Sequence, residues 1–164
     1  MKRKLLYTLA ALWICINLQA QEVKNGLTWY TDVMQVQQLS EKTKKPVFAF
    51  FTGSDWCGWC HKLQAAVFNK QGFKDWAKKN VILLELDYPR NKQLPEKLQK
   101  QNAELQQFFQ VQGYPTVWMF YIVKDKASGK FNISALGSLG YPRAEQGKEA
   151  DAFITNANQI LKNK

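Results

Sequence analysis

Short apolar runs alternate along this chain with longer stretches in which apolar residues recur every three or four positions. The run Val47–Phe51 is aromatic-rich and bounded by Pro46 and Gly53, which predicts a buried strand. Val81–Asp87 has the same character and predicts a buried parallel strand. Apolar residues at helical spacing predict helices between these runs. Because strands alternate with helices, the pattern predicts one α/β domain. The first helix is expected near 33–45, and the second directly after Cys57. A third should begin within 88–101 and run to the turn before Gly113, and the last should lie near 145–162.

The segments between these elements give further expectations. Residues 21–26 are polar and should be loose before a short strand at 27–30, whereas residues 88–101, with Pro89 and Pro95, should form a lengthened loop. Gly72 should interrupt the helical pattern that follows Cys57. Two strands, about 116–123 and 131–136, should form a hairpin; Gly137, Gly140 and Pro142 should form the loop after it.

Two cysteines stand three positions apart directly after the first apolar run. After Cys57 and Cys60, Leu63, Ala66 and Val67 follow at helical spacing, so Cys57 should lie where a strand ends and a helix begins. Amide N–H groups and the helix dipole at that place favour a thiolate, and can lower a cysteine pKa from about 8.5 to roughly 3.5–7.5. Cys57 is therefore the predicted nucleophile, and Cys60, one turn on, can close a disulfide with it.

Trp56-Cys57-Gly58-Trp59-Cys60 after a buried strand resembles the active site of the thioredoxin superfamily. A second motif agrees, because Gly113-Tyr114-Pro115-Thr116 before an apolar run resembles that family's cis-proline loop. The resemblance covers residues 28–162 and is strongest to secreted thioredoxin-like reductases. It implies a thioredoxin fold, with a mixed central sheet flanked by helices on both faces. It also implies a thiol–disulfide oxidoreductase that acts on protein or peptide disulfides together with an unidentified redox partner.

The resemblance also assigns roles to residues around the cysteine pair. Substrate contacts are expected from the residues beside the cysteines and from the proline loop: Trp56, Gly58, Trp59, Tyr114 and Pro115. The family usually buries an acidic residue in the strand before the motif, where it relays protons to the second cysteine. That strand has no acid here. Asp55, Glu85 and Asp87 are the three candidates for this role, and the sequence does not choose among them.

The first twenty residues have the features of a signal peptide. Lys2-Arg3-Lys4 precedes an apolar stretch from Leu5 to Leu18, and Ala20 is a small residue at the expected cleavage point. Residues 1–20 are therefore predicted to be removed, which leaves a domain of residues 21–164 in the periplasm or outside the cell, without stable membrane insertion. Cleavage also removes Cys15, so the only remaining pair is Cys57 and Cys60, and a redox couple is more plausible than a structural disulfide across so short a loop.

Other functions fit the sequence less well. Cys57-x-x-Cys60-His61 is also the attachment motif of a c-type haem electron carrier, but such a haem needs a mostly helical pocket. A thioredoxin-fold binding or chaperone module with incidental cysteines is a third alternative. With one histidine, a zinc site lacks ligands, so neither a metal nor another cofactor is expected. The net charge of +10 comes from lysines spread over many segments without stacking aromatic residues, which disfavours nucleic acid as a partner. The sequence does not fix the redox potential or the direction of electron flow, although the resemblance favours a reductase of protein disulfides that acts through Cys57 and Cys60.

Overall fold

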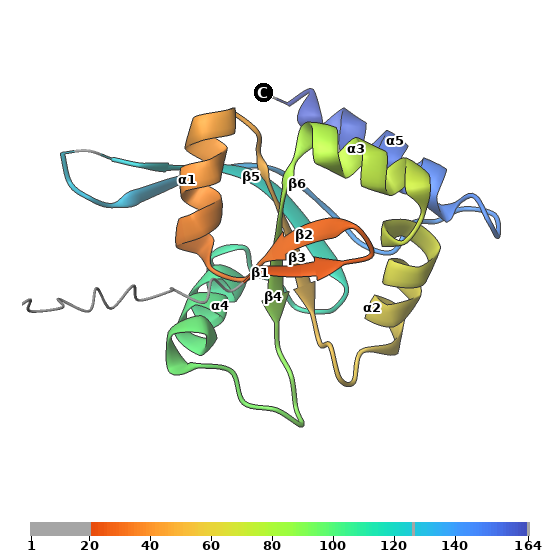
Figure 1. The fold of residues 1–164 in the computed structure, drawn as a ribbon, viewed down its shortest axis with the longest axis horizontal. Coiled ribbons are helices and arrows are strands. Elements are labelled where there is room, and N and C mark those ends of the chain that lie inside the picture. The colour runs from red at the N-terminus through yellow and green to blue at the C-terminus, as the bar shows by residue number, and fades with distance from the viewer. Residues whose placement is uncertain (1–20, 126, 164) are drawn as a thin grey trace, which may run out of the picture.

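The computed structural model describes residues 21–125 and 127–163 (Figure 1). The predicted signal peptide, residues 1–20, lies outside them. None of the helices in the described ranges is long and apolar enough to cross a bilayer. The elements follow one another as β1 Gln21–Lys24, β2 Leu27–Tyr30, α1 Val33–Thr43, β3 Val47–Thr52, α2 Gly58–Leu63, the π-helix η1 Gln64–Phe68, α3 Gln71–Asn80, β4 Ile82–Asp87, α4 Glu96–Phe108, β5 Thr116–Lys124, β6 Phe131–Leu139 and α5 Glu149–Leu161.

The strands form one six-stranded sheet in the order β1-β2-β4-β3-β5-β6. Strands β2, β4 and β3 run parallel, whereas β1, β5 and β6 are antiparallel to their neighbours. This is the mixed central sheet that the sequence predicts. The strand that leads to the cysteines, β3, pairs with β4 on one side and β5 on the other, so the active-site segment leaves the sheet from its centre.

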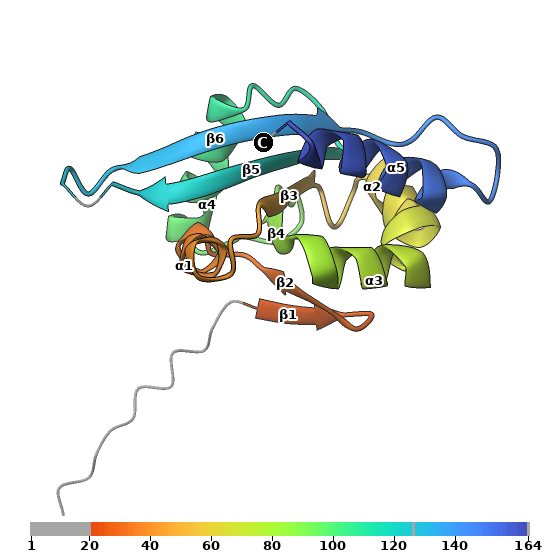
Figure 2. The same ribbon diagram turned by 90° about the horizontal axis from the view of Figure 1, so that it is seen from above.

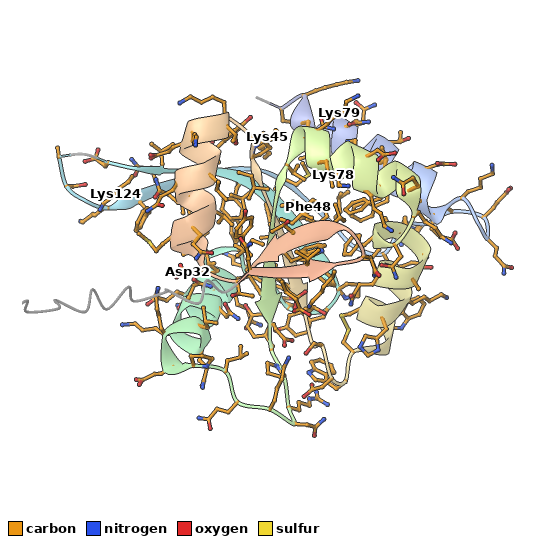
Figure 3. The ribbon with its side chains drawn as sticks, viewed as in Figure 1. Asp32, Lys45, Phe48, Lys78, Lys79 and Lys124 are labelled. Atoms are coloured by element: carbon orange, nitrogen blue, oxygen red, sulfur yellow. A yellow bond between two sulfur atoms is a disulfide. The ribbon has the colours of Figure 1, made fainter. Side chains whose placement is uncertain are left out.

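Helices cover both faces of the sheet, as Figures 1 and 2 show. Phe48 and Phe50 of β3 face α2, η1, α3 and α5, in the same apolar cluster as the two cysteines. Val47, Ala49 and Phe51 face the other way, into the cluster under α1 and α4. Because β3 is buried on both faces, it reads as a continuous apolar run rather than an alternating one. Figure 3 shows Phe48 in the interior.

The expectation that residues 21–26 are loose is wrong. Gln21–Lys24 forms strand β1, which pairs with β2 through the turn Asn25-Gly26. Both turn residues have positive φ, 52° for Asn25 and 79° for Gly26. Asn-Gly between two extended segments is a strong signal for a two-residue hairpin, because both residues tolerate the left-handed region. The signal was present in the sequence, although the polar composition of β1 hides its strand character.

Two other expectations about glycines are also wrong. Gly72 lies within the first turn of α3, because the helical chain is interrupted earlier, at Asn69 and Lys70. Gly137 lies within β6 rather than in a loop, and a β-bulge in the β5–β6 pairing lies close to it, at Met119/Phe120. A Cβ atom at Gly137 would lie 3.1 Å from Ile160 of α5, so the missing side chain lets that helix pack closely on the strand.

Most of the other boundaries agree with the sequence pattern. Asp32 caps α1, since its carboxylate accepts the Met34 N–H at 2.8 Å. The helix ends at Lys44, which has a φ of 59°. The predicted long connection after β4 contains only residues 88–95, because α4 begins at Glu96. Strands β5 and β6 form the predicted hairpin, and α5 begins later than expected, at Glu149.

Candidate active site

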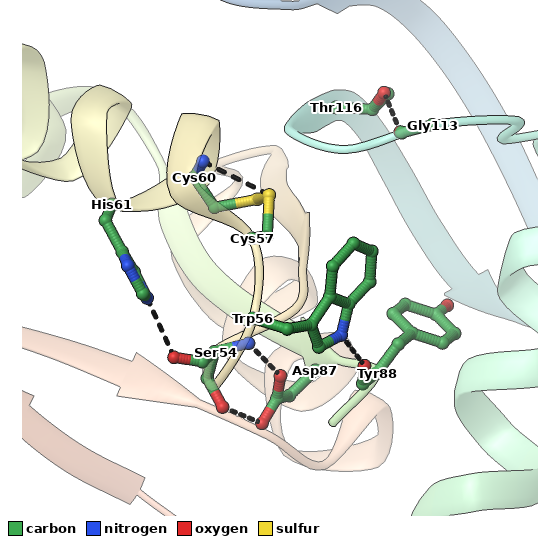
Figure 4. Close-up of a disulfide and its surroundings, with 9 residues drawn as sticks. All are labelled: Ser54, Trp56, Cys57, Cys60, His61, Asp87, Tyr88, Gly113 and Thr116. Atoms are coloured by element: carbon green, nitrogen blue, oxygen red, sulfur yellow. Dashed lines mark hydrogen bonds between the residues drawn. A yellow bond between two sulfur atoms is a disulfide. The ribbon is translucent and has the colours of Figure 1, made fainter. Parts of the chain in front are cut away.

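Cys57 and Cys60 lie at the predicted junction between strand and helix. Cys57 is the N-cap residue of α2, and the two sulfurs are joined in a disulfide of 2.05 Å. Cys57 has 5% of its surface exposed to solvent, whereas Cys60 is fully buried. The backbone N–H of Cys60 also donates to Sγ of Cys57 at 3.2 Å (Figure 4). The first cysteine therefore has both the outward position and an amide donor that can stabilise negative charge on its sulfur.

The turn before Cys57 is anchored by Asp87 at the end of β4. Its carboxylate accepts the Ser54 N–H at 2.8 Å and the Ser54 hydroxyl at 2.6 Å (Figure 4). It also forms an ion pair with Lys92 at 2.9 Å. The two contacts with Ser54 join residues 33 positions apart. Asp87 is expected from the sequence only as a candidate proton relay; its role in holding the cysteine loop follows from these contacts.

Trp56 packs against the protein rather than standing free. Its indole N–H donates to the carbonyl of Tyr88 at 2.8 Å (Figure 4), and its ring meets that of Tyr114 edge-on at 5.8 Å. The rings of Tyr88 and Tyr114 stack at 5.1 Å. Burial raises the pKa values of both tyrosine hydroxyls above the ordinary value of 10.0.

Trp59 is the exposed aromatic residue of the motif, with 57% of its surface open to solvent. It makes an edge-on contact with Tyr141 at 5.2 Å, and the ammonium of Lys62 lies 4.7 Å from its ring centroid. Gly58 beside it is also exposed. The two tryptophans therefore have different roles: Trp56 supports the loop, and Trp59 offers an open apolar surface next to the disulfide.

The predicted proline loop packs beside this cluster. Tyr114 contacts the apolar cluster that contains both cysteines, and the Tyr114–Pro115 peptide bond is cis. The Thr116 hydroxyl donates to the Gly113 carbonyl at 2.8 Å and closes the turn (Figure 4). All the predicted site residues therefore lie in the two segments around the disulfide.

The three candidate proton-relay acids have different surroundings. Asp55 lies at the surface, where the backbone N–H groups of Arg90 and Asn91 hold the pKa of its carboxyl below the ordinary value. Glu85 and Asp87 are buried, and strand alternation places both on the sheet face that carries the cysteines. Glu85 accepts two hydrogen bonds from Lys24, each of 2.9 Å. Burial of Lys24 by itself lowers the pKa of its ammonium, but the carboxylates of Glu85 and Glu22 together more than offset this, so the pKa is raised.

His61 occupies a local structural position. Its Nε2 atom lies 2.8 Å from the Ser54 carbonyl oxygen (Figure 4). The mostly helical pocket that the haem alternative requires is not the setting of this motif, which follows the central strand of a six-stranded sheet. Within residues 21–125 and 127–163 no group of three or more histidine, cysteine or acidic side chains could hold a metal ion.

Comparisons with known proteins agree with this geometry. The disulfide bond reductase DsbH of Chlamydia pneumoniae is 32% identical over 102 residues, and the thioredoxin-related protein DsbJ of the same organism is 26% identical over 164 residues. The matches cover 62% and 97% of this chain but only 61% and 45% of those relatives' own lengths.

Solved structures give the same picture. The structure of a DsbH oxidoreductase superposes with a TM-score of 0.69 at 28% identity, covering 84% of this chain and 86% of that one. A thioredoxin from Thermus thermophilus shares the fold, with a TM-score of 0.55 at 16% identity. A sequence model of the thioredoxin-like family matches residues 28–121, which include the cysteine pair and the proline loop. With its mixed sheet and its cysteine pair at the end of the central strand, the chain belongs to the thioredoxin-like family.

Proposed function

We propose that this protein is a thiol–disulfide oxidoreductase that reduces protein disulfides outside the cytoplasm. The observation that carries the proposal is the Cys57–Cys60 disulfide at the start of α2, with the outer sulfur in contact with an amide donor and the inner sulfur buried. The similarity to a disulfide bond reductase supports the reducing direction. The signal-like residues 1–20 support the compartment.

In the reduced protein, the Cys57 thiolate attacks one sulfur of a substrate disulfide. A mixed disulfide forms, and the other substrate sulfur leaves as a thiolate. The Cys60 thiol then loses its proton and attacks Sγ of Cys57, which releases the second substrate thiolate and leaves the Cys57–Cys60 disulfide. Two electrons pass to the substrate. A dithiol partner must return them by the reverse exchange, with Cys57 as the sulfur that the partner reaches.

The surface around Cys57 fits an extended polypeptide. Trp59 provides an open aromatic face, and the loop around Tyr114 and Pro115 packs beside the cysteine cluster. Substrates of this kind present a disulfide on a flexible segment, which can align with such a loop through backbone hydrogen bonds. Trp56 stabilises this surface through the hydrogen bond from its indole N–H to the Tyr88 carbonyl.

Two measurements test the proposal. Reduced protein should convert insulin to its free chains at a rate well above that of dithiothreitol alone, and Cys57→Ser should abolish this activity. Equilibration with glutathione should give a reduction potential in the reducing part of the thioredoxin-fold range, near about −270 mV rather than about −120 mV. A protein with inert thiols and intact fold would instead be the binding or chaperone module, and a strongly oxidising potential would reverse the direction.

The compartment needs its own experiment. Intact-mass analysis of protein recovered from the cell envelope should show a chain that begins near Gln21. Recovery of the full-length chain from the cytoplasm would contradict the proposed location, without bearing on the chemistry of the cysteines.

A further inference from the structure

A cavity of about 560 Å³ lies between the connection after β4 and helix α4. In Figure 1 this connection forms the lower tip of the molecule, close to the loop that carries the cysteines. Its walls are mixed: Arg90, Lys92 and Gln106 are among the polar residues that line it, and Pro89 and Leu94 are among the apolar ones. The reaction described above uses none of these residues.

The backbone of this connection is fixed from the active-site loop. The Asp55 carboxylate accepts the Arg90 N–H at 3.0 and 3.1 Å and the Asn91 N–H at 2.7 Å. On the inner side, the buried Asn102 side chain donates to the Asp87 carbonyl at 2.9 Å. The cavity wall is therefore held at a defined position relative to the cysteine motif.

The side chain of Arg90 also has a defined position, because it stacks on an aromatic ring. Its guanidinium carbon lies 3.8 Å from the centroid of the Trp56 ring. Trp56 is the residue immediately before Cys57. A guanidinium stacked on an aromatic ring keeps its N–H donors free at the edge of the plane, and stacking reduces the freedom that a bound ligand would otherwise remove.

The charged groups near Arg90 have other partners, and the Arg90 guanidinium itself has no counterion among the described residues. The Lys92 ammonium is already paired with Asp87 at 2.9 Å. The Asp55 carboxylate is occupied by backbone N–H groups. In residues 21–125 and 127–163, no carboxylate lies within ion-pair distance of the Arg90 guanidinium. An unpaired guanidinium can bind a carboxylate through two parallel N–H···O hydrogen bonds.

We propose that Arg90, stacked on Trp56 at the mouth of this cavity, is a specificity residue that binds an acidic side chain of the substrate polypeptide close to its reactive cysteine. The inference rests on the proposed function, because the substrate chain is brought to Arg90 by its sulfur at Cys57. The cavity beside Arg90 accommodates the residues that flank the acid.

The test uses two synthetic peptides that each contain one intramolecular disulfide and differ only in glutamate or glutamine next to the first cysteine. Pre-reduced protein is mixed with each peptide, the reaction is quenched with acid, and the second-order rate constant is taken from the free thiols formed. An uncharged small disulfide, bis(2-hydroxyethyl) disulfide, reports on the cysteines alone. The variants are Arg90→Gln, Arg90→Lys and, as a matched control, Arg143→Gln, an exposed arginine in the loop before α5.

We expect the wild-type protein to prefer the glutamate peptide about fivefold, the ratio given by about 1 kcal/mol for an exposed charge pair. Arg90→Gln should bring the ratio to about one, Arg90→Lys should retain part of it, and Arg143→Gln should leave it unchanged. Added salt should reduce the preference, because it screens an exposed pair.

Equal rates for the two peptides with the wild-type protein would overturn the inference while the proposed function stands. A preference that survives Arg90→Gln would also overturn it. Inertness towards both peptides and the small disulfide would refute the proposed function and the inference together. Circular dichroism of each variant confirms that the fold is intact.

Discussion

The indole of Trp56 lies directly over Gly53, so closely that a Cβ atom at Gly53 would be 2.3 Å from the ring. Cβ atoms essentially never make non-bonded contacts this short. Residue 53, directly after β3, must therefore lack a side chain if Trp56 is to bond to the Tyr88 carbonyl and stack against Arg90. One glycine thus sets the position of the residue before the nucleophile.

Gly53→Ala should displace the Trp56 indole and destabilise the protein by about 1–3 kcal/mol, the usual effect of overpacking. Urea unfolding gives the change in free energy, and the fluorescence of Trp56 should change with it. Gly58→Ala is the matched control, since nothing lies within 4 Å of a Cβ at that residue. Equal stability of Gly53→Ala and wild type would mean that the indole can move away without loss.

The two cysteines should behave differently when each is replaced. Cys60→Ser should accumulate a mixed disulfide with substrate, because Cys57 attacks and no second thiol resolves the product. Cys57→Ser should trap nothing, since Cys60 is fully buried. Non-reducing gels and mass spectrometry of the trapped species check this. Iodoacetamide should alkylate Cys57 of the reduced wild-type protein first, and preferential alkylation of Cys60 would reverse the assignment.

The hydrogen bonds of Asp55 to the connection after β4 should depend on pH. Because the backbone N–H groups of Arg90 and Asn91 lower the pKa of Asp55 from its ordinary value of 3.8, its carboxylate contributes stability above the unfolded-state pKa. That contribution is lost as pH falls through the lower folded-state value. The amide resonances of Arg90 and Asn91 should therefore titrate below pH 3.8.

Asp55→Asn supplies the control for that titration. In this variant the two amide resonances should not follow the acid titration, and the preference for an acidic peptide should weaken because Arg90 is less well fixed. Titration of both amides above pH 3.8 in the wild-type protein would contradict the stabilising contact.

The ion pair of Lys24 and Glu85 should couple the N-terminal hairpin to the sheet. Lys24→Met leaves a carboxylate with only 10% of its side chain exposed and no cation beside it, and should cost about 1–3 kcal/mol. Glu85→Gln in the Lys24→Met background should recover part of this loss, because the buried charge is removed. Denaturant unfolding of the two single variants and the double variant measures the coupling. Additive effects would show that the pair contributes no net stability.

The sequence by itself determined the class of fold and the position of the reactive pair. Apolar runs such as Val47–Phe51 indicate strands because a strand buried on both faces has few alternatives, and Asp32 marks a helix start through its own cap. Cys57 and Cys60 are recognisable because the strand, the turn and the helix that place them are contiguous in the chain. The β1–β2 hairpin was also encoded, by Asn25-Gly26.

Only the tertiary structure decided how that pair is supported. Arg90 and Asp55 are 35 positions apart, and Lys24 and Glu85 are 61 apart. Contacts of this kind depend on which strands become neighbours in the sheet, and no local periodicity reports that order. For the same reason the sequence does not distinguish Trp56 from Trp59. In the folded chain Trp56 packs over Gly53 and bonds to Tyr88 in the β4–α4 connection, whereas Trp59 stays exposed beside Tyr141.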